Sequence, residues 1–358
     1  MEFLSEYGLF LAKTVTLVVA LAAIIILLLS AGGRGRKSDK GQIEITYLNE
    51  RFEEMRDLLR DAMLEPDELK ALEKEEKKKR KQEAAEKKRA AKKQKDGAEA
   101  VESSGKNKNR VFVLDFVGDI KASACDNLRE EISVVLSQAK EGDEVVVRLE
   151  SGGGMVHSYG LASSQLARIT GRKIPLTVCV DKVAASGGYM MACVANKIVA
   201  APFAILGSIG VLAQLPNFHR LLKKNDVDFE MFTAGEYKRT VTMFGENTPK
   251  GREKFIEELE DTHVLFKEFV SEHRPQVDIS KVATGEVWYG RRALEVNLVD
   301  ELCTSDEYLL KQIDAADIYE VSYTFKKTLP ERLGLAAQGA VDRLLLTWWD
   351  RLSNHRWF

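Results

Sequence analysis

The feature that most constrains this chain is a series of short, almost purely apolar runs from residue 110 onward, separated by amphipathic segments. Runs of Val, Ile and Leu without polar alternation are typical of parallel strands buried on both faces. The amphipathic segments predict the helices that connect such strands, so we expect an α/β layered fold. Expected strands cover 111–117, 144–149, 175–180, 197–200 and 229–232, and expected helices cover 123–140, 155–170, 186–195, 217–224 and 248–273.

Residues 9–31 form a hydrophobic run, and residues 14–31 within it carry no charge. A helix needs about 20 apolar residues to cross the hydrocarbon of a bilayer. A cleaved signal peptide would start with basic residues, whereas this chain has Glu2 and Glu6 there. We therefore expect a retained transmembrane helix that contacts membrane lipid through residues 9–31. The basic residues that follow it favour a cytoplasmic side for the rest of the chain.

Charge is unevenly spread along the chain. Residues 67–95 hold 13 Lys/Arg against 7 Asp/Glu, which leaves the remainder with a net charge of −8. An acidic body is not the profile of a DNA-binding protein, and we expect no nucleic-acid partner, although the basic arm alone could touch anionic lipid or RNA.

Composition predicts four parts. They are 1–40, the anchor with its basic flank; 41–109, a charged helical arm and linker; 110–328, a globular domain; and 329–358, which holds an amphipathic helix over 329–352. Within the arm we expect a helix over 42–63, ended by Pro66.

The four cysteines stand singly in segments that are expected to be helix, strand or core. No Cys/His cluster has the spacing of metal ligands. We expect four buried or half-buried thiols, no metal site and no cofactor.

Three glycine-rich turns each follow an apolar strand, which is where open α/β folds place their sites. Their sequences are E-S-G-G-G-M (150–155), V-A-A-S-G-G-Y-M-M-A (183–192) and L-G-S-I-G-V (206–211). The first lacks the spacing of nucleotide-binding glycine motifs. Its backbone N–H groups suit an oxyanion or a phosphate, and a simple tight turn is the alternative.

Ser186 is the candidate nucleophile, at the expected start of an apolar helix. The alternative is an ordinary N-cap serine. Small residues on both sides expose the hydroxyl, and a helix N-terminus offers N–H groups to a developing oxyanion. The pattern is similar to a nucleophile elbow without matching it.

A serine nucleophile needs a base. His219, His263 and His273 are expected on the surface, which leaves His157, close to the first glycine turn, as the histidine candidate. Lys238 is the other option, and a lysine serves as a base only where a dry site keeps it neutral. On the residues alone, Lys238 is more readily explained as a surface lysine.

Four motifs stand in order along the chain: A-A-S-G-G-Y (184–189), G-S-I-G-V (207–211), T-A-G-E-Y-K (233–238) and G-E-V-W-Y-G-R-R-A-L-E-V-N-L-V-D-E-L (285–302). Together they resemble the signal peptide peptidase A (protease IV) family, closely over residues 110–302. The layout of anchor, charged arm and single domain is similar to the SohB-type inner-membrane members. The resemblance implies a crotonase-like (Clp-protease-like) fold and a serine endopeptidase domain.

The resemblance also implies a Ser-Lys dyad. It makes Ser186 the nucleophile, Lys238 the general base and Ser208 the residue that orients the lysine. The amides of Gly187 and Gly153 would form the oxyanion hole. This chain departs from the family in having glycine at 153, where members often carry proline.

Further implications of the resemblance are ring-shaped homo-oligomers and hydrolysis of small or hydrophobic peptides, including signal-peptide remnants. Family members lie in the bacterial inner membrane with the catalytic domain outside the cytoplasm, whereas the local charges here favour the inside. Two other functions compete with a peptidase: a crotonase-fold enzyme acting on acyl-CoA, and a non-enzymatic membrane scaffold.

Overall fold

The structure is a computed structural model that describes residues 13–14, 16, 41–64, 68 and 108–325. Contacts divide the chain into a unit over residues 43–323 and a second unit over 1–42 and 324–358, most of which lies outside the described residues. Most of the expected anchor, most of the basic arm and the whole helix expected over 329–352 also lie outside them. Among the described residues, no helix is both long and apolar enough to cross a bilayer.

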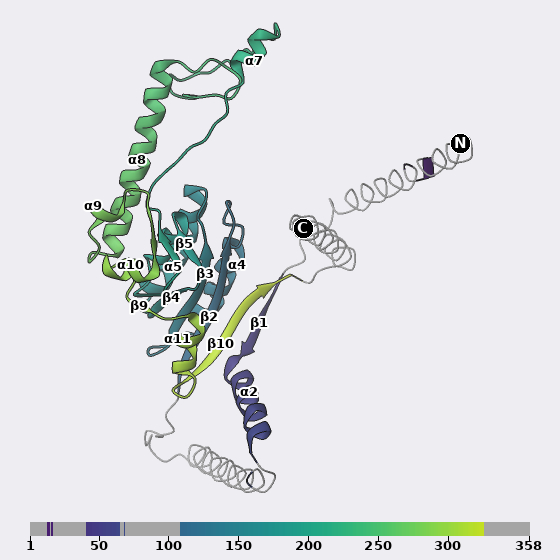
Figure 1. Cartoon of the computed structure of the whole chain (residues 1–358), viewed down its shortest axis with the longest axis vertical. Helices are drawn as coiled ribbons and strands as arrows, with labels where there is room; N and C mark the ends of the chain where they lie inside the picture. The colour runs from purple at the N-terminus through teal and green to yellow at the C-terminus, as the bar shows by residue number, and fades with distance from the viewer. Residues whose placement is uncertain (1–12, 15, 17–40, 65–67, 69–107, 326–358) are drawn as a thin grey trace, which may run out of the picture. The chain divides into compact units, whose positions relative to one another are not determined.

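One sheet organises the larger unit (Figure 1). Its strands follow the order β1-β10-β2-β3-β4-β6-β9, and β5, β7 and β8 continue from β3. The pairs from β10 to β9 are parallel, as are β3–β5 and β5–β7, whereas β8 runs antiparallel to β7. The strands are β1 Gln42–Tyr47, β2 Asn109–Gly118, β3 Glu144–Ser151, β4 Leu176–Val180, β5 Val183–Ala185, β6 Lys197–Ala200, β7 Ile205–Gly207, β8 Val287–Tyr289, β9 Glu301–Leu302 and β10 Ala316–Thr324.

The central strands bury side chains on both faces. In β2, Phe112, Leu114 and Phe116 enter a larger core, while Val111 and Val113 enter a smaller core on the opposite face. Both sets are apolar because residues 111–114 are buried on both faces of the strand, which is why this part of the sequence shows no polar alternation. The predicted α/β layered fold is confirmed.

Helices cover both faces of the sheet (Figure 1). Side chains of α4, α5, α6 and α8 build the larger core, and those of α2 and α11 complete the smaller one. The helices are α2 Leu48–Met63, α4 Cys125–Gln138, α5 Val156–Gly171, α6 Gly187–Ala192, α7 His219–Lys224, α8 Pro249–His273, α9 Ile279–Val282, α10 Gly290–Glu295 and α11 Ser305–Gln312. All four cysteines are buried with free thiols.

The helix expected over 42–63 is too long at its start, because residues 42–47 form strand β1 and the helix begins at Leu48. Strand β1 lies at the edge of the sheet beside β10. The buried Asn49 then fixes the helix start, since its amide donates to the carbonyl of Ala316 at 2.9 Å and accepts from the N–H of Ile318 at 2.7 Å. Part of the expected arm therefore packs with the globular body.

The strand expected over 229–232 is wrong. These residues are exposed and pair with no strand in the described part of the chain. They lie in residues 212–248, which we call the distal segment, where the chain leaves the sheet after β7 and extends away from it before returning as α8 (Figure 1). An apolar strand sequence cannot form a strand where no partner edge is within reach.

Candidate active site

Ser186 occupies the turn between β5 and α6 with φ 53° and ψ −120°. A non-glycine residue rarely adopts positive φ, and such strain is concentrated at functional sites. The Ser186 side chain makes no capping bond to α6, so the N-cap interpretation is wrong. Within the described residues the hydroxyl makes no hydrogen bond, and it stands at a strained strand-to-helix turn, as in a nucleophile elbow.

The glycines after Ser186 are required by close packing. A Cβ at Gly187 would lie 2.4 Å from Cγ of Tyr159, and one at Gly188 would lie 2.4 Å from the carbonyl oxygen of Ser151. Neither contact is sterically possible, so glycine lets the start of α6 press against α5 and the end of β3. This packing presents the Gly187 N–H beside the Ser186 hydroxyl.

The first glycine turn lies directly beside this elbow. Gly153 has φ +88°, and a Cβ there would be 2.6 Å from the backbone nitrogen of Gly187. Proline has φ fixed near −65° and cannot adopt the conformation of Gly153 in this turn. The backbone of the turn therefore accounts for glycine at 153, where family members often carry proline. Gly152, by contrast, has open space around its Cβ position.

The two predicted oxyanion donors differ in their hydrogen bonding. The Gly153 N–H donates to Oγ of Ser151 at 3.1 Å, which turns it toward the protein interior. Gly154, which sequence reasoning missed, lines the cavity with Ser186 and Gly187. Its N–H has no acceptor among the described residues. The signal that identifies Gly154 is an N–H without an acceptor among the described residues, in a residue that lines the cavity. No sequence pattern separates it from its glycine neighbours.

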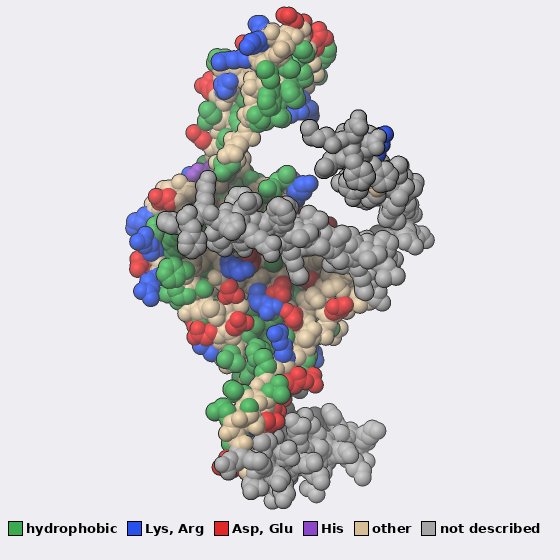
Figure 2. Space-filling model, turned by 45° about the vertical axis from the view of Figure 1, so that its right-hand side comes forward, with side chains coloured by type: hydrophobic (Ala, Val, Ile, Leu, Met, Phe, Trp, Pro, Cys, Tyr) green, Lys and Arg blue, Asp and Glu red, His purple; other side chains and the backbone are tan. Residues whose placement is uncertain are grey.

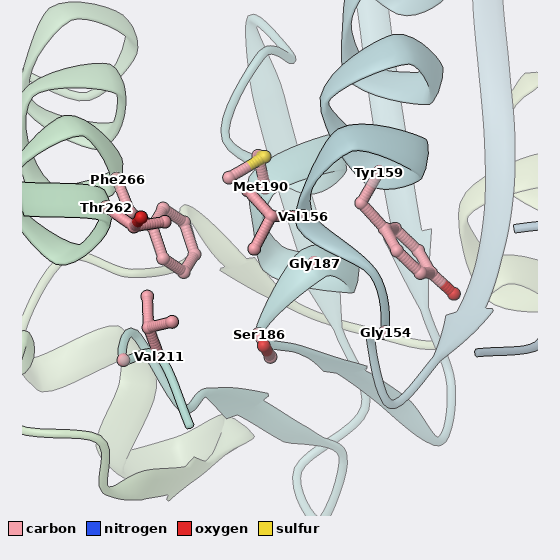
Figure 3. Close-up of a pocket in the computed structure, with 10 residues that line it drawn as sticks. Gly154, Val156, Tyr159, Ser186, Gly187, Met190, Val211, Thr262 and Phe266 are labelled. Carbon is pink, nitrogen blue, oxygen red and sulfur yellow. The ribbon is translucent and has the colours of Figure 1, made fainter. Parts of the chain in front are cut away.

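Ser186 opens into a small cavity (Figure 3). Its free volume is about 20 Å³, which is room for about one water molecule. A substrate side chain can enter only if one wall moves. The lining residues are Gly154, Val156, Tyr159, Ser186, Gly187, Met190, Gly210, Val211, Thr262 and Phe266.

Ser208 follows β7, and its φ of 50° is again strained. Its N–H donates to the carbonyl of Glu286 at 2.7 Å, which fixes the turn. The hydroxyl makes no hydrogen bond within the described part of the chain. Strands β5 and β7 pair with Ala185 opposite Gly207, so Ser208 and Ser186 leave neighbouring strands at the same level of the sheet.

Lys238 is not brought to this cavity. It lies on the distal segment, exposed to solvent, and does not line the cavity beside Ser186. Within the described chain, Nζ of Lys238 makes no hydrogen bond or ion pair. The structure therefore brings together Ser186, Gly187 and the first glycine turn, with Ser208 on the neighbouring strand, but leaves the predicted base apart from them.

None of the four histidines that the structure describes lines the cavity. His157 is exposed near the start of α5 and does not line the cavity. The other three helical histidines were expected on the surface, but His219, His263 and His273 are each half-buried. Nδ1 of His273 lies 2.9 Å from the carbonyl of Phe269. Helix α8 is covered on one face, which is why its histidines are not fully solvated.

Comparison with known proteins matches the chain to one peptidase family over most of its length. Residues 2–166 match the N-terminal model of peptidase family S49, and residues 168–318 match the peptidase family S49 model. A probable protease SohB from Haemophilus influenzae is 52% identical over 344 residues, 96% of each chain. A probable protease SohB from Buchnera aphidicola subsp. Schlechtendalia chinensis is 47% identical over 312 residues, 87% of this chain and 100% of its own.

Among solved structures, a mutant of the 1510-N membrane-bound stomatin-specific protease in complex with a substrate peptide covers 63% of this chain and 96% of its own, at 13% identity and TM-score 0.39. The sequence matches are the decisive ones, because two family models in tandem and a relative identical at half of its positions span nearly the whole chain. The chain belongs to peptidase family S49, and it is a protease.

Proposed function

We propose that this protease cleaves peptide bonds with Ser186 as nucleophile and Lys238 as general base, on a crotonase-like (Clp-protease-like) fold. The single observation that carries the proposal is the Ser186 turn. Its Ser186 has positive φ, its hydroxyl makes no hydrogen bond among the described residues, and it lines a largely apolar cavity together with Gly187 at a helix start and Gly154 of a glycine turn. This is the arrangement that acyl transfer to a serine requires.

The oxyanion donors in this proposal are the N–H groups of Gly187 and of the first glycine turn. In the present geometry Gly154 is the better second donor, since the Gly153 N–H is already bonded to Ser151. Use of Gly153, the donor expected from the family resemblance, requires this bond to break. Hydrogen-bond donors that are fixed before reaction stabilise the oxyanion without reorganisation cost.

Lys238 reaches the site, we propose, when the distal segment is covered by a second copy of the chain. In one copy the segment exposes many large apolar side chains (Figure 2), with Leu212 at 78% and Phe232 at 89%. Soluble proteins rarely leave such surface uncovered. The exposed set is Leu212, Leu215, Phe218, Leu221, Val227, Phe229, Met231, Phe232, Tyr237 and Phe244. In a ring-like homo-oligomer, the neighbouring copy covers this surface and excludes water from around Lys238.

The reaction then proceeds in two halves. Neutral Lys238 takes the proton of the Ser186 hydroxyl as the oxygen attacks the substrate carbonyl, and the backbone N–H groups bind the oxyanion. The protonated amine gives its proton to the leaving amine, which leaves an ester on Ser186. Lys238 next takes a proton from a water molecule as the water oxygen attacks the ester carbonyl. The protonated amine then gives this proton to Oγ of Ser186 as the second product leaves, which restores the neutral amine and the serine hydroxyl. Ser208 holds the amine in the orientation that both steps need.

Substrates, in this proposal, are small or hydrophobic peptides such as signal-peptide remnants. The apolar wall formed by Val156, Met190, Val211 and Phe266 favours such side chains. We also propose that residues 9–31 anchor the enzyme in the bacterial inner membrane, so that peptides released within that membrane lie close to the site.

The decisive experiment combines labelling with cleavage assays. A serine-reactive acylating probe should label the wild type at Ser186, and Ser186→Ala and Lys238→Ala should each abolish cleavage of a hydrophobic peptide while remaining folded. Mixing the two inactive variants tests whether one copy supplies the lysine to another, because activity then returns in mixed oligomers. Loss of cleavage in His157→Ala, with Lys238→Ala still active, overturns the dyad.

A further inference from the structure

A buried chain of hydrogen bonds runs behind the first glycine turn. The N–H of Gly153 donates to Oγ of Ser151 at 3.1 Å, Oγ of Ser151 lies 2.5 Å from the Tyr159 hydroxyl, and that hydroxyl donates to the carbonyl of Asp119 at 2.7 Å. Tyr159 is 0% exposed and Ser151 is 2% exposed. The Ser151 and Tyr159 hydroxyls at the centre of the chain are therefore shielded from water, and each depends on its neighbours in the chain for a partner.

The direction of the chain is fixed by its last bond. A tyrosine hydroxyl has one hydrogen, and here that hydrogen goes to the Asp119 carbonyl, which can only accept. The Ser151 hydroxyl must then donate to Tyr159 and accept from Gly153. All three donors point the same way, and hydrogen bonds aligned in this manner strengthen one another.

The far end of the chain is itself rigid. The Asp119 carboxylate accepts from the N–H of Ser123 at 2.8 Å and from the Ser123 hydroxyl at 2.8 Å. The next residue, Ile120, accepts from the N–H of Met155 at 2.8 Å. The loop after β2 therefore contacts the glycine turn twice. It bonds Met155 directly through Ile120, and it is linked to Gly153 through Tyr159 and Ser151.

The ring of Tyr159 makes the second contact that matters. It lies against Gly187, where an added Cβ would be 2.4 Å from its Cγ. Figure 3 shows the hydroxyl pointing away from the cavity, so Tyr159 cannot touch a substrate through its oxygen. One side chain thus supports both backbone segments that carry the oxyanion donors, the ring beneath Gly187 and the hydroxyl beneath the glycine turn.

We propose that Tyr159 is the positioning residue of the oxyanion hole, acting through Ser151 on the glycine turn and through its ring on Gly187. This inference rests on the proposed role of Ser186. It assigns to Tyr159 and Ser151 a role in the rate of the chemical step, in addition to their place in the core.

The first test is Tyr159→Phe, which keeps the ring and removes only the hydroxyl. The Asp119 carbonyl still accepts from the N–H of Ala122 at 3.0 Å, so this variant leaves no orphaned carbonyl and should fold. We expect kcat for a hydrophobic peptide to fall at least about 10-fold, in keeping with donors that lose their alignment. KM should stay within about twofold, since the ground-state contacts are unchanged.

A second readout separates positioning from general destabilisation. A peptide boronate forms a tetrahedral adduct with a serine nucleophile, and its affinity should fall by the same factor as kcat/KM in Tyr159→Phe. Ser151→Ala breaks the same chain from its other end and should show the same losses. The double variant should lose no more than either single variant, because both changes break one chain.

The matched control is Tyr308→Phe. Its hydroxyl is also enclosed and donates to Glu144 at 2.6 Å, but it belongs to the smaller core on the other face of the sheet. It should lower Tm without changing kcat. The inference is overturned if Tyr159→Phe and Ser151→Ala keep the wild-type kcat and boronate affinity, or if Tyr308→Phe loses as much. A wild type that the acylating probe does not label overturns the proposed function itself.

Discussion

The N–H of Ser186 donates to the carbonyl of Gly207 at 2.7 Å. This bond joins the turn that carries the proposed nucleophile to the residue just before Ser208. Both serines leave their strands with positive φ, so neither turn would keep its shape if the two strand ends separated. The conformation of the Ser186 turn therefore depends on the pairing of β5 with β7, and the residues around Ser186 alone do not determine it.

Gly207→Ala should disturb this junction. Gly207 has φ +85°, and an added Cβ would lie 2.8 Å from Cδ1 of Trp288. We expect a loss of about 1–3 kcal/mol in the free energy of unfolding, together with a lower kcat, measured by urea denaturation and peptide cleavage. Gly160→Ala, in an open stretch of α5 with no atom near its Cβ, should be neutral or stabilising. Equal behaviour of the two variants would contradict the role of the junction.

Arg274→Met should be strongly destabilising. The Arg274 side chain is 2% exposed and bonds both oxygens of Asp300 at 2.8 Å, while Asp300 also accepts from the N–H of Ile198 at 2.7 Å. Removing the cation breaks two charge-assisted hydrogen bonds to a carboxylate that is 31% exposed, so we expect a loss of about 1.5–3 kcal/mol in the free energy of unfolding. Lys311→Met, which removes an exposed ion pair with Glu307, should leave the urea midpoint unchanged.

Stability should fall with rising pH because of Glu131. Burial raises the pKa of this carboxyl to about 7, with a smaller contribution from Asp115, while the N–H of Tyr323 opposes the rise. In the unfolded chain the group loses its proton near pH 4.5. Its cost to the folded state is therefore absent below pH 4.5, grows between pH 4.5 and 7, and reaches about 3 kcal/mol above pH 7.

Glu131→Gln removes this titration, so it should be more stable than the wild type at pH 8 and similar to it at pH 4.5. The measurement is the free energy of unfolding in urea across that range. Glu130→Gln alters the exposed neighbouring carboxyl and should keep the wild-type slope. A wild-type slope in Glu131→Gln would show that another group dominates.

Lys238→Arg should be nearly inactive if Lys238 is the base, because a guanidinium does not lose its proton in the working range. Ser208→Ala should lower kcat while leaving Ser186 reactive toward the acylating probe. Loss of cleavage in His157→Ala, together with activity retained in Lys238→Arg, would exclude the lysine.

Two truncations should behave differently. Deletion of residues 1–41 removes the proposed anchor and leaves β1 intact, so the product should be soluble and active on soluble peptides. Deletion of residues 1–64 also removes Asn49, whose side chain bonds the backbone of β10. We expect this second product to unfold at a lower urea concentration. Equal midpoints would show that β1 and α2 add nothing to the sheet.

The strands that could be predicted from the sequence are those that pair with a neighbouring strand on each side. Strands β2, β3, β4 and β6 are largely apolar runs. A strand that is buried on both faces needs apolar residues at successive positions, so it can be recognised in the sequence. Strands β5, β7, β8 and β9 are each two or three residues long. Such pieces are strands only because a neighbour is in place, and no periodicity can appear over so short a length.

The site was predictable in part for the same reason. Local packing rules place Ser186 at a helix start after a strand, and glycines flank it. Whether Lys238 stands near Ser186 depends on where the distal segment lies, which local pattern does not encode. The hydrogen-bonding difference between Gly153 and Gly154 depends on Ser151 and Tyr159, eight residues apart, and appears only once β3 and α5 are folded together.

The place of β10 between β1 and β2 has a consequence for synthesis on the ribosome. Tyr47 in β1 bonds Asp317 in β10, a partner 270 residues later in the chain. At roughly 5–20 residues per second, β1 emerges about 15–55 seconds before its partner strand exists. During that interval its edge is open to other nascent chains. Glu44, in the middle of the strand, is the kind of charge that discourages such pairing.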